Sequence, residues 1–320
     1  MKIHKDAPKI TRYRAFVDKV LRHKQAQLYT ESAFAETAKL LDVNPELYTI
    51  WNYRRDILLD WFKPDTPEAT HELIKQELVF TVGHLKRFPK CYWIWNHRKW
   101  CLEYDSLTNW DNEMVLIDKF LEADSRNYHV WQYRRYVIDR MKLAQSPKQQ
   151  AQTDLQEFEY TTKQISKDIS NYSALHNRSR LIKLLFERSP ECATLFYTKN
   201  KHGFLVEEWK LAQNAFYTDP DDSSVWIYIK WLLGDYFLND LTKDQAREVV
   251  ENAIQDISKL NALEAEESSH DNQWCLKTLV FLEQQLSRVT GVRSEKKNQL
   301  LEKLVQQDTI RAKRYQDAKD

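Results

Sequence analysis

Glycine is scarce in this chain, with four glycines among 320 residues. The usual share in soluble proteins is about 7%. Doubly wound nucleotide-binding folds need glycine-rich turns, and neither the G-x-G-x-x-G pattern nor the P-loop pattern occurs in the sequence. Long stretches rich in Glu, Lys, Gln and Leu favour helices joined by short turns. The composition therefore predicts an all-helical chain.

Cysteines and long apolar runs are also few. The four cysteines (Cys91, Cys101, Cys192 and Cys275) form no C-x-x-C pair, which indicates reduced, structural thiols rather than a disulfide framework or a zinc site. Mean hydropathy is -0.69, no apolar run approaches the length of a membrane span, and the first residues lack the apolar core of a signal peptide. We expect a cytoplasmic protein with no membrane span and no metal site of its own.

The charges nearly cancel. The 48 basic and 47 acidic residues give a net charge of +1, so no overall field attracts nucleic acid, and we expect no nucleic-acid partner. Any site for an anion must therefore be local. A hydrophobic share of 42% is enough to build a buried core.

The chain repeats a short motif in which tryptophan is followed by arginine three residues later. The copies lie around residues 45–55, 89–99, 125–135, 171–178 and 222–231, with a degenerate sixth copy at 272–277. Their key positions are Trp51, Trp95, Trp131, Leu175, Trp226 and Trp274. A unit of roughly 35 residues with loops added at one end is typical of helical-hairpin repeats. The sequence predicts an all-α fold, a right-handed α-solenoid (crescent) of antiparallel helical hairpins, as a single domain over residues 1–320.

Each copy is preceded by a second amphipathic segment and a short polar turn. Met114, Ile117 and Leu121 are spaced to form one apolar stripe of a helix, and Asp124 to Asn127 form a turn that can cap the next helix. Where a turn contains proline, that residue suits the first helical turn. We expect the tryptophans to pack between neighbouring hairpins and the arginines to pair with carboxylates of the adjacent repeat. The starts of the second helices should lie along a rim, where free N–H groups can meet an anion.

The repeats resemble those of protein prenyltransferase alpha subunits. The similarity is carried by residues 127–135 and 95–100 and extends over roughly residues 30 to 285. Residues 120–129 and 213–226 resemble the Rab geranylgeranyltransferase (type II) branch of the family, in the compact fungal form that has no leucine-rich or immunoglobulin-like extension. Leu175 is a departure, because the family usually has tryptophan there, and we expect that repeat to pack more loosely.

The resemblance implies one subunit of a heterodimeric enzyme. In this family the beta subunit holds the zinc and most of the isoprenoid pocket, so this chain would carry no cofactor and would be inactive alone. The implied reaction transfers geranylgeranyl from geranylgeranyl diphosphate to C-terminal cysteines of Rab GTPases, which are presented by an escort protein.

The resemblance also implies a set of site residues at the starts of two second helices. Lys90, Tyr128 and His129 are the predicted catalytic residues, because donors aimed at a leaving diphosphate stabilise the charge that develops there. Lys90, Tyr92 and Asn127 are the predicted residues of the diphosphate-binding or partner-binding rim. The simpler interpretation of Lys90 is a solvated lysine in a turn, and Tyr128 and His129 could instead contact the beta subunit.

Two other functions remain open from the sequence. One is the alpha subunit shared by the farnesyl and geranylgeranyl transferases that act on CaaX proteins. The other is a non-catalytic helical-repeat scaffold, although the tetratricopeptide pattern W-x-x-L-G-x-x-Y is absent. The charged segment 293–320 carries Leu300, Leu301, Leu304 and Val305 at helical spacing, which predicts one amphipathic C-terminal helix.

Overall fold

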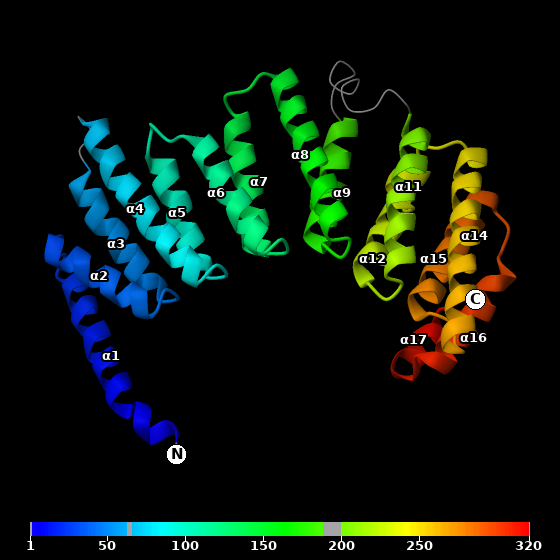
Figure 1. The fold of residues 1–320 in the computed structure, drawn as a ribbon, viewed down its shortest axis with the longest axis horizontal. Helices are drawn as coiled ribbons and strands as arrows, with labels where there is room; N and C mark the ends of the chain where they lie inside the picture. The colour runs from blue at the N-terminus through cyan, green and yellow to red at the C-terminus, as the bar shows by residue number, and fades with distance from the viewer. Residues whose placement is uncertain (1, 63–65, 188–199, 320) are drawn as a thin grey trace. The chain divides into compact units, whose positions relative to one another are not determined.

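Helices make up all the regular structure in the parts of the chain that the computed structural model describes, which are residues 2–62, 66–187 and 200–319. The prediction of an all-α fold is confirmed. The chain forms two compact units, residues 1–140 and 141–320, and each is a stack of antiparallel helical hairpins (Figure 1). Cys192 lies outside the described residues.

Unit 1 contains an N-terminal helix followed by three hairpins. Its helices are α1 (Lys2–Gln25), α2 (Glu31–Val43), α3 (Tyr48–Trp61), α4 (Pro67–Arg87), α5 (Tyr92–Tyr104), α6 (Trp110–Ala123) and α7 (Tyr128–Lys142), the last of which runs two residues past the unit. The hairpins are α2–α3, α4–α5 and α6–α7.

Unit 2 continues the same pattern and ends in short helices. Its helices are α8 (Pro147–Lys167), α9 (Tyr172–Glu187), α11 (Lys201–Thr218), α12 (Ser223–Leu232), α13 (Asp235–Leu238), α14 (Lys243–Ser268), α15 (Gln273–Thr290), α16 (Glu295–Gln307) and α17 (Ala312–Asp317). A 3-10 turn, η1 (Thr309–Arg311), joins the last two helices. The hairpins are α8–α9, α11–α12 and α14–α15.

Four residues separate the two helices of every hairpin. In unit 1 the turns are residues 44–47, 88–91 and 124–127, and they lie along one edge of that unit, the lower edge in Figure 1. In unit 2 they are residues 168–171, 219–222 and 269–272. The turn prolines Pro45, Pro89 and Pro220 are the second residue of their turns, so they lie outside the helix rather than in its first turn as the sequence predicts.

The first helix of each hairpin buries its apolar stripe. On α6, Ile117 and Leu121 are fully buried, while Met114 is half-buried. The second helix buries the tryptophan of the motif, and Trp51, Trp131 and Trp226 are the largest fully buried side chains among the described residues. The core of each unit therefore lies between the two helix layers of its hairpins.

The sixth repeat has a different register from the one that the sequence predicts. In the other five copies the key residue is the fourth residue of the second helix, as Trp51 is in α3. Because Asn272 caps α15, which begins at Gln273, the fourth residue there is Leu276. Leu276 is fully buried, whereas Trp274 is only half-buried.

The C-terminal segment forms more than the single helix that its leucine spacing predicts. After α16 the chain turns at Asp308 through η1 into α17. Leu301 and Leu304 of α16 pack with Leu276 of α15 and with Tyr315 of α17 in one buried cluster. This segment closes the end of unit 2.

The repeat that lacks tryptophan contains an open cavity. Leu175 is buried, and it lines a cavity of about 500 Å³ between α9 and α12. Tyr172, Ile227 and Trp231 line the same cavity. The cavity lies where the sequence departs from the tryptophan motif.

Candidate functional site

The motif tryptophans are structural. In four repeats the indole Nε1 donates to the backbone carbonyl of the second turn residue, six residues earlier, at 2.8 or 2.9 Å. The donors are Trp51, Trp95, Trp131 and Trp226, and the acceptors are Pro45, Pro89, Ser125 and Pro220. Each tryptophan therefore fills the core of its hairpin and also holds the turn against the helix, which leaves it no role at a site.

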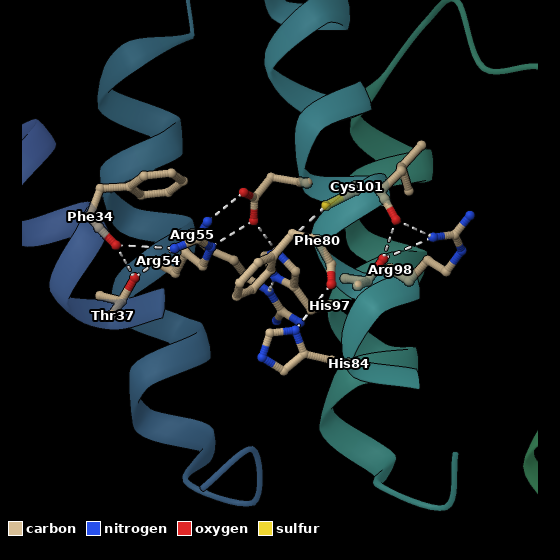
Figure 2. Close-up of polar contacts among 12 residues, drawn as sticks. Phe34, Thr37, Arg54, Arg55, Phe80, His84, His97, Arg98 and Cys101 are labelled. Atoms are coloured by element: carbon tan, nitrogen blue, oxygen red, sulfur yellow. Dashed lines mark hydrogen bonds and ion pairs between the residues drawn. The ribbon is translucent and has the colours of Figure 1, made fainter. Parts of the chain in front are cut away.

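The motif arginines pair with buried carboxylates of the next repeat. Arg54 of α3 binds Glu77 of α4 through two bonds, Nε–Oε2 at 2.7 Å and Nη2–Oε1 at 2.6 Å. Figure 2 shows the same guanidinium reaching back to the Thr37 hydroxyl and the Phe34 carbonyl of α2. A single arginine thus joins three helices from two repeats.

We call such a contact between an arginine and a buried carboxylate of the next repeat a junction. Two further junctions have the same arrangement. Arg98 binds Glu113 at 2.6 and 2.8 Å, and the Tyr133 hydroxyl donates to the same carboxylate at 2.6 Å. In unit 2, Arg178 binds Glu208 at 2.6 and 2.7 Å, with Tyr228 donating at 2.6 Å. The predicted pairing of these arginines with the adjacent repeat is confirmed.

The first junction contains a Cys–His–Glu arrangement that is chemically inert. His97 is 0% exposed and donates from Nε2 to Glu77 at 2.9 Å, while Arg55 Nε lies 3.3 Å from its Nδ1 (Figure 2). Burial lowers the pKa of His97, although Glu77 opposes this shift. Cys101 Sγ lies 3.7 Å from Nε2, but burial raises the pKa of its thiol far above neutrality. Because only a thiolate is a good nucleophile, Cys101 is a core residue.

The predicted site residues lie at the turn edge of unit 1. Lys90 is in the turn before α5, its side chain is 72% exposed, and its Nζ lies 3.6 Å from Oδ2 of Asp124 in the next turn. Tyr92 and Tyr128 are the first residues of α5 and α7, and both are about half exposed. His129 follows Tyr128 and is partly buried. The structure thus brings these four residues together on one rim.

Aromatic rings connect this rim from one repeat to the next. The ring of Tyr92 lies 5.7 Å from that of His129 in an edge-to-face arrangement, and His129 also contacts Tyr128. On the other side, Trp93 lies 5.1 Å from Tyr48, the first residue of α3. Tyr48, Tyr92, Trp93, Tyr128 and His129 therefore form what we call the aromatic rim.

Two members of the aromatic rim, Tyr48 and Trp93, are absent from the predicted site. The repeat alignment held a signal for Tyr48, because it aligns with Tyr92 at the start of its helix. Among the other copies only Trp274 occupies the equivalent second position of its helix, so the contact with Tyr48 rather than the repeat alignment identifies Trp93.

The two helix starts at this rim differ in how they are capped. Asn127 is 2% exposed, and its side-chain oxygen accepts from the N–H groups of His129 and Val130 at 3.0 and 3.3 Å. Asn127 is therefore the cap of α7. By contrast, α5 begins after Cys91 with no side-chain cap hydrogen bond. The positive end of α5 thus lies next to the exposed cation Lys90, which is the arrangement that favours an anion.

The imidazole of His129 is neutral near pH 7, mainly because it is partly buried. Burial lowers the pKa of His129, Glu46 raises it, and the nearby Lys90 lowers it further, with a net decrease. A neutral imidazole can donate one hydrogen bond to an oxyanion. Lys90 and His129 are thus close enough to interact electrostatically on the rim.

The described residues offer no metal site and no membrane-spanning helix. Within residues 2–62, 66–187 and 200–319, no group of three or more His, Cys, Asp or Glu side chains could hold a metal ion. None of the described helices is long and apolar enough to cross a membrane. Cys91, Cys101 and Cys275 are buried free thiols.

Comparison with known sequences identifies the repeats. Residues 30–61, 74–105, 110–141, 154–185 and 205–236 match the model of the protein prenyltransferase alpha subunit repeat. The type-2 geranylgeranyl transferase alpha subunit of Candida albicans is 34% identical over 99% of this chain and 93% of its own length. The Saccharomyces cerevisiae protein of the same name is 35% identical over 97% and 91%, and the human one is 36% identical over 71% and 38%.

Comparison with solved structures supports the fold. The Candida albicans protein geranylgeranyltransferase-I complexed with GGPP contains a chain that superposes with a TM-score of 0.64 at 21% identity, covering 96% of this chain and 89% of that one. The repeats and the near full-length relatives agree, so the chain belongs to the protein prenyltransferase alpha-subunit family, as a member of its type-2 geranylgeranyl transferase kind.

Proposed function

We propose that this chain pairs with a prenyltransferase beta subunit and that the heterodimer transfers geranylgeranyl from geranylgeranyl diphosphate to C-terminal cysteines of Rab GTPases bound to an escort protein. The names of the relatives support the enzyme class. A zinc ion in the beta subunit would activate the acceptor thiol. The buried free thiols of this chain suit a reducing compartment such as the cytoplasm.

The observation that carries the proposal is Lys90 beside the start of α5. An ion pair as exposed as Lys90–Asp124 is weak, so Lys90 can exchange Asp124 for a more highly charged diphosphate at little cost. When the bond between carbon and the bridging oxygen breaks, negative charge grows on the leaving diphosphate. A lysine held at that position stabilises the transition state more than the ground state.

The other rim residues would assist Lys90. The Tyr92 and Tyr128 hydroxyls are exposed donors on the same edge, and neutral His129 can donate one further hydrogen bond. Because the oxygen of Asn127 already caps α7, its role in this proposal is to position Tyr128 and His129 rather than to bind the diphosphate itself.

The test replaces Lys90 and a matched lysine. Lys90→Ala in the assembled heterodimer should lower the single-turnover rate of prenyl transfer by about tenfold to a hundredfold, as expected for a charge-assisted contact to the leaving group. Lys86→Ala is the control, since Lys86 is an exposed lysine of the preceding helix α4. A Lys90→Ala heterodimer that assembles and reacts at the control rate would exclude Lys90 from catalysis.

The acceptor class is tested separately. We expect co-expression with a type-2 beta subunit to yield an active enzyme that modifies a Rab protein in the presence of its escort protein. Co-expression with the beta subunits that serve CaaX acceptors should yield no activity on CaaX peptides. Activity only in the second case would assign the chain to the CaaX branch.

A further inference from the structure

A second group of cations lies in unit 2. Lys230 of α12, Lys277 of α15 and Arg314 of α17 line one cavity of about 520 Å³, together with Arg311 of η1. No carboxylate lines this cavity among the described residues. The cations come from α12, from α15 and from the continuous segment η1–α17, which are brought together because α12 packs on α15 and α16 packs on both α15 and α17.

One buried carboxylate neutralises part of this charge. Asp308 is buried and does not itself line the cavity, and its Oδ2 lies 3.2 Å from Lys277 and 3.1 Å from Arg311. It also accepts a hydrogen bond from the Tyr315 hydroxyl at 2.7 Å. That bond, together with Arg311 and Lys277, outweighs burial and holds the pKa of Asp308 at about 2. Asp308 is thus a fixed negative charge shared by two of the four cations.

The other two cations have no counter-charge in the described part of the chain. Neither Lys230 nor Arg314 has an ion pair there, and both face the cavity. Burial lowers the pKa of Lys230, and repulsion from Lys277 and Arg314 lowers it further. Like charges gathered in one cavity cost free energy unless an anion binds between them.

The size of the cavity and the arrangement of its charges indicate the kind of anion. An extended acidic peptide places side chains on the same face about 7 Å apart, which spreads its charge beyond one cavity. A phosphate or diphosphate group instead concentrates several negative oxygens in a small volume, and arginine forks match that geometry. Trp274 and Val280 line the same cavity, and because both are only partly buried they offer an apolar surface beside the cations.

We propose that Lys230, Lys277, Arg311 and Arg314 form a binding site for a compact phosphate-class anion, either a free diphosphate or the phosphate end of an ester whose organic part contacts Trp274 and Val280. The site is built from α12, α15, η1 and α17 and is separate from the aromatic rim in sequence and in composition. It requires no metal ion.

The test measures anion binding to the full-length chain by calorimetry. All variants carry Lys90→Ala, so that the rim of unit 1 contributes no diphosphate site of its own. The double variant Lys230→Gln with Arg314→Gln should raise the dissociation constant for diphosphate by about tenfold or more, because hydrogen bonds from charged donors are lost. The control pair, Lys243→Gln with Lys259→Gln, removes the same charge from exposed positions on α14 and should leave the constant unchanged.

Three ligands distinguish the possible sources of the anion. Tighter binding of phenyl phosphate than of inorganic phosphate supports an ester, whereas tighter binding of diphosphate supports a free anion. The single variant Arg314→Gln, at an exposed position, repeats the test if the double variant does not fold. The proposal is overturned if both variant pairs weaken binding equally, if sodium chloride of equal ionic strength abolishes the binding heat, or if only a glutamate-rich peptide binds.

Discussion

At the scale of single residues, the buried carboxylates of Glu77, Glu113 and Glu208 hold neighbouring repeats together. Each accepts two bonds from an arginine of one repeat and a third from a tyrosine or histidine of the next. The sequence predicts that the arginines pair across repeats, but it does not predict their partners. Glu77 follows Arg54 by 23 residues, Glu113 follows Arg98 by 15, and Glu208 follows Arg178 by 30, so no fixed spacing marks them.

Removing one of these carboxylates should strongly destabilise unit 1. In Glu113→Ala the buried Arg98 loses both of its carboxylate bonds, and an uncompensated buried charge costs about 3–5 kcal/mol. Glu122→Ala, at an exposed position at the end of the same helix, should change the free energy of unfolding by less than about 0.5 kcal/mol. Urea denaturation followed by circular dichroism measures the stability of both variants. Equal midpoints would show that the contact between Arg98 and Glu113 does not stabilise the fold.

The candidate site was predictable only where the repeat alignment and the family resemblance pointed to it. Lys90, Tyr92, Tyr128 and His129 follow from their positions next to the motif, and the structure places them on one rim. Trp93 could not be predicted, because its membership depends on a ring contact between α3 and α5. Asn127 was predicted as a rim residue, and in the structure its side chain caps α7. The sequence does not separate these two roles, because a polar residue at a helix start is as suitable for capping as for binding.

At the scale of elements, the hairpin is a unit of fixed geometry. Six hairpins have turns of four residues, although the sequences of those turns differ from Asn44-Pro45-Glu46-Leu47 to Asp219-Pro220-Asp221-Asp222. The sequence predicts the hairpins because their apolar periodicity is local. It misplaces the sixth register because a lone tryptophan suggested the alignment there, whereas the cap residue Asn272 sets where α15 begins.

The two tryptophans at the start of α5 provide a matched pair for testing the hairpin. Trp95 is buried and bonded to the turn, so Trp95→Ala should lower the free energy of unfolding by about 3–5 kcal/mol. Trp93 is only half-buried on the aromatic rim, so Trp93→Ala should cost less than half as much. Thermal and urea unfolding compare the two variants, and a larger loss in Trp93→Ala would contradict the assigned roles.

At the scale of the whole molecule, the fold class was predictable and the division into two units was not. The motif recurs with similar spacing on both sides of the boundary at Arg140 and Met141, and α7 runs through it without a break. Local periodicity therefore carries no sign of the division, which depends on how densely helices contact one another. The near-equal numbers of acidic and basic residues also hide a cationic cavity that three separate segments assemble in unit 2.

The overall stability of the chain should fall in acid. The lowered pKa of His97 means that its neutral form stabilises the native state above about pH 6.5, and this contribution is lost as the pH falls below that value. Burial alone would raise the pKa of Glu77, but hydrogen bonds from His97 and Arg54 hold it at about 2, so its contribution is lost between about pH 4.5 and pH 2. Both titrations therefore lower the stability of the native state as the pH falls.

Melting temperatures at pH 7.5 and pH 5.5 test the first step. We expect the wild-type chain to melt at a lower temperature at pH 5.5, and His97→Gln to show a smaller difference between the two values. His270→Gln, at an exposed position in unit 2, should keep the wild-type difference. An unchanged difference in His97→Gln would assign the acid sensitivity to other groups.

The bond between each motif tryptophan and the second residue of its turn has a consequence for how such a chain can change its length. The indole bonds to a carbonyl six residues earlier, so an insertion in the turn would break this bond and displace the tryptophan side chain from the core. At the opposite end, no tryptophan bond of this kind spans the described connections of four residues between Lys142 and Pro147 and of five residues between Tyr104 and Trp110. In evolution and in engineering, the turn ends of these four hairpins are closed to insertions, while their opposite ends can accept new loops.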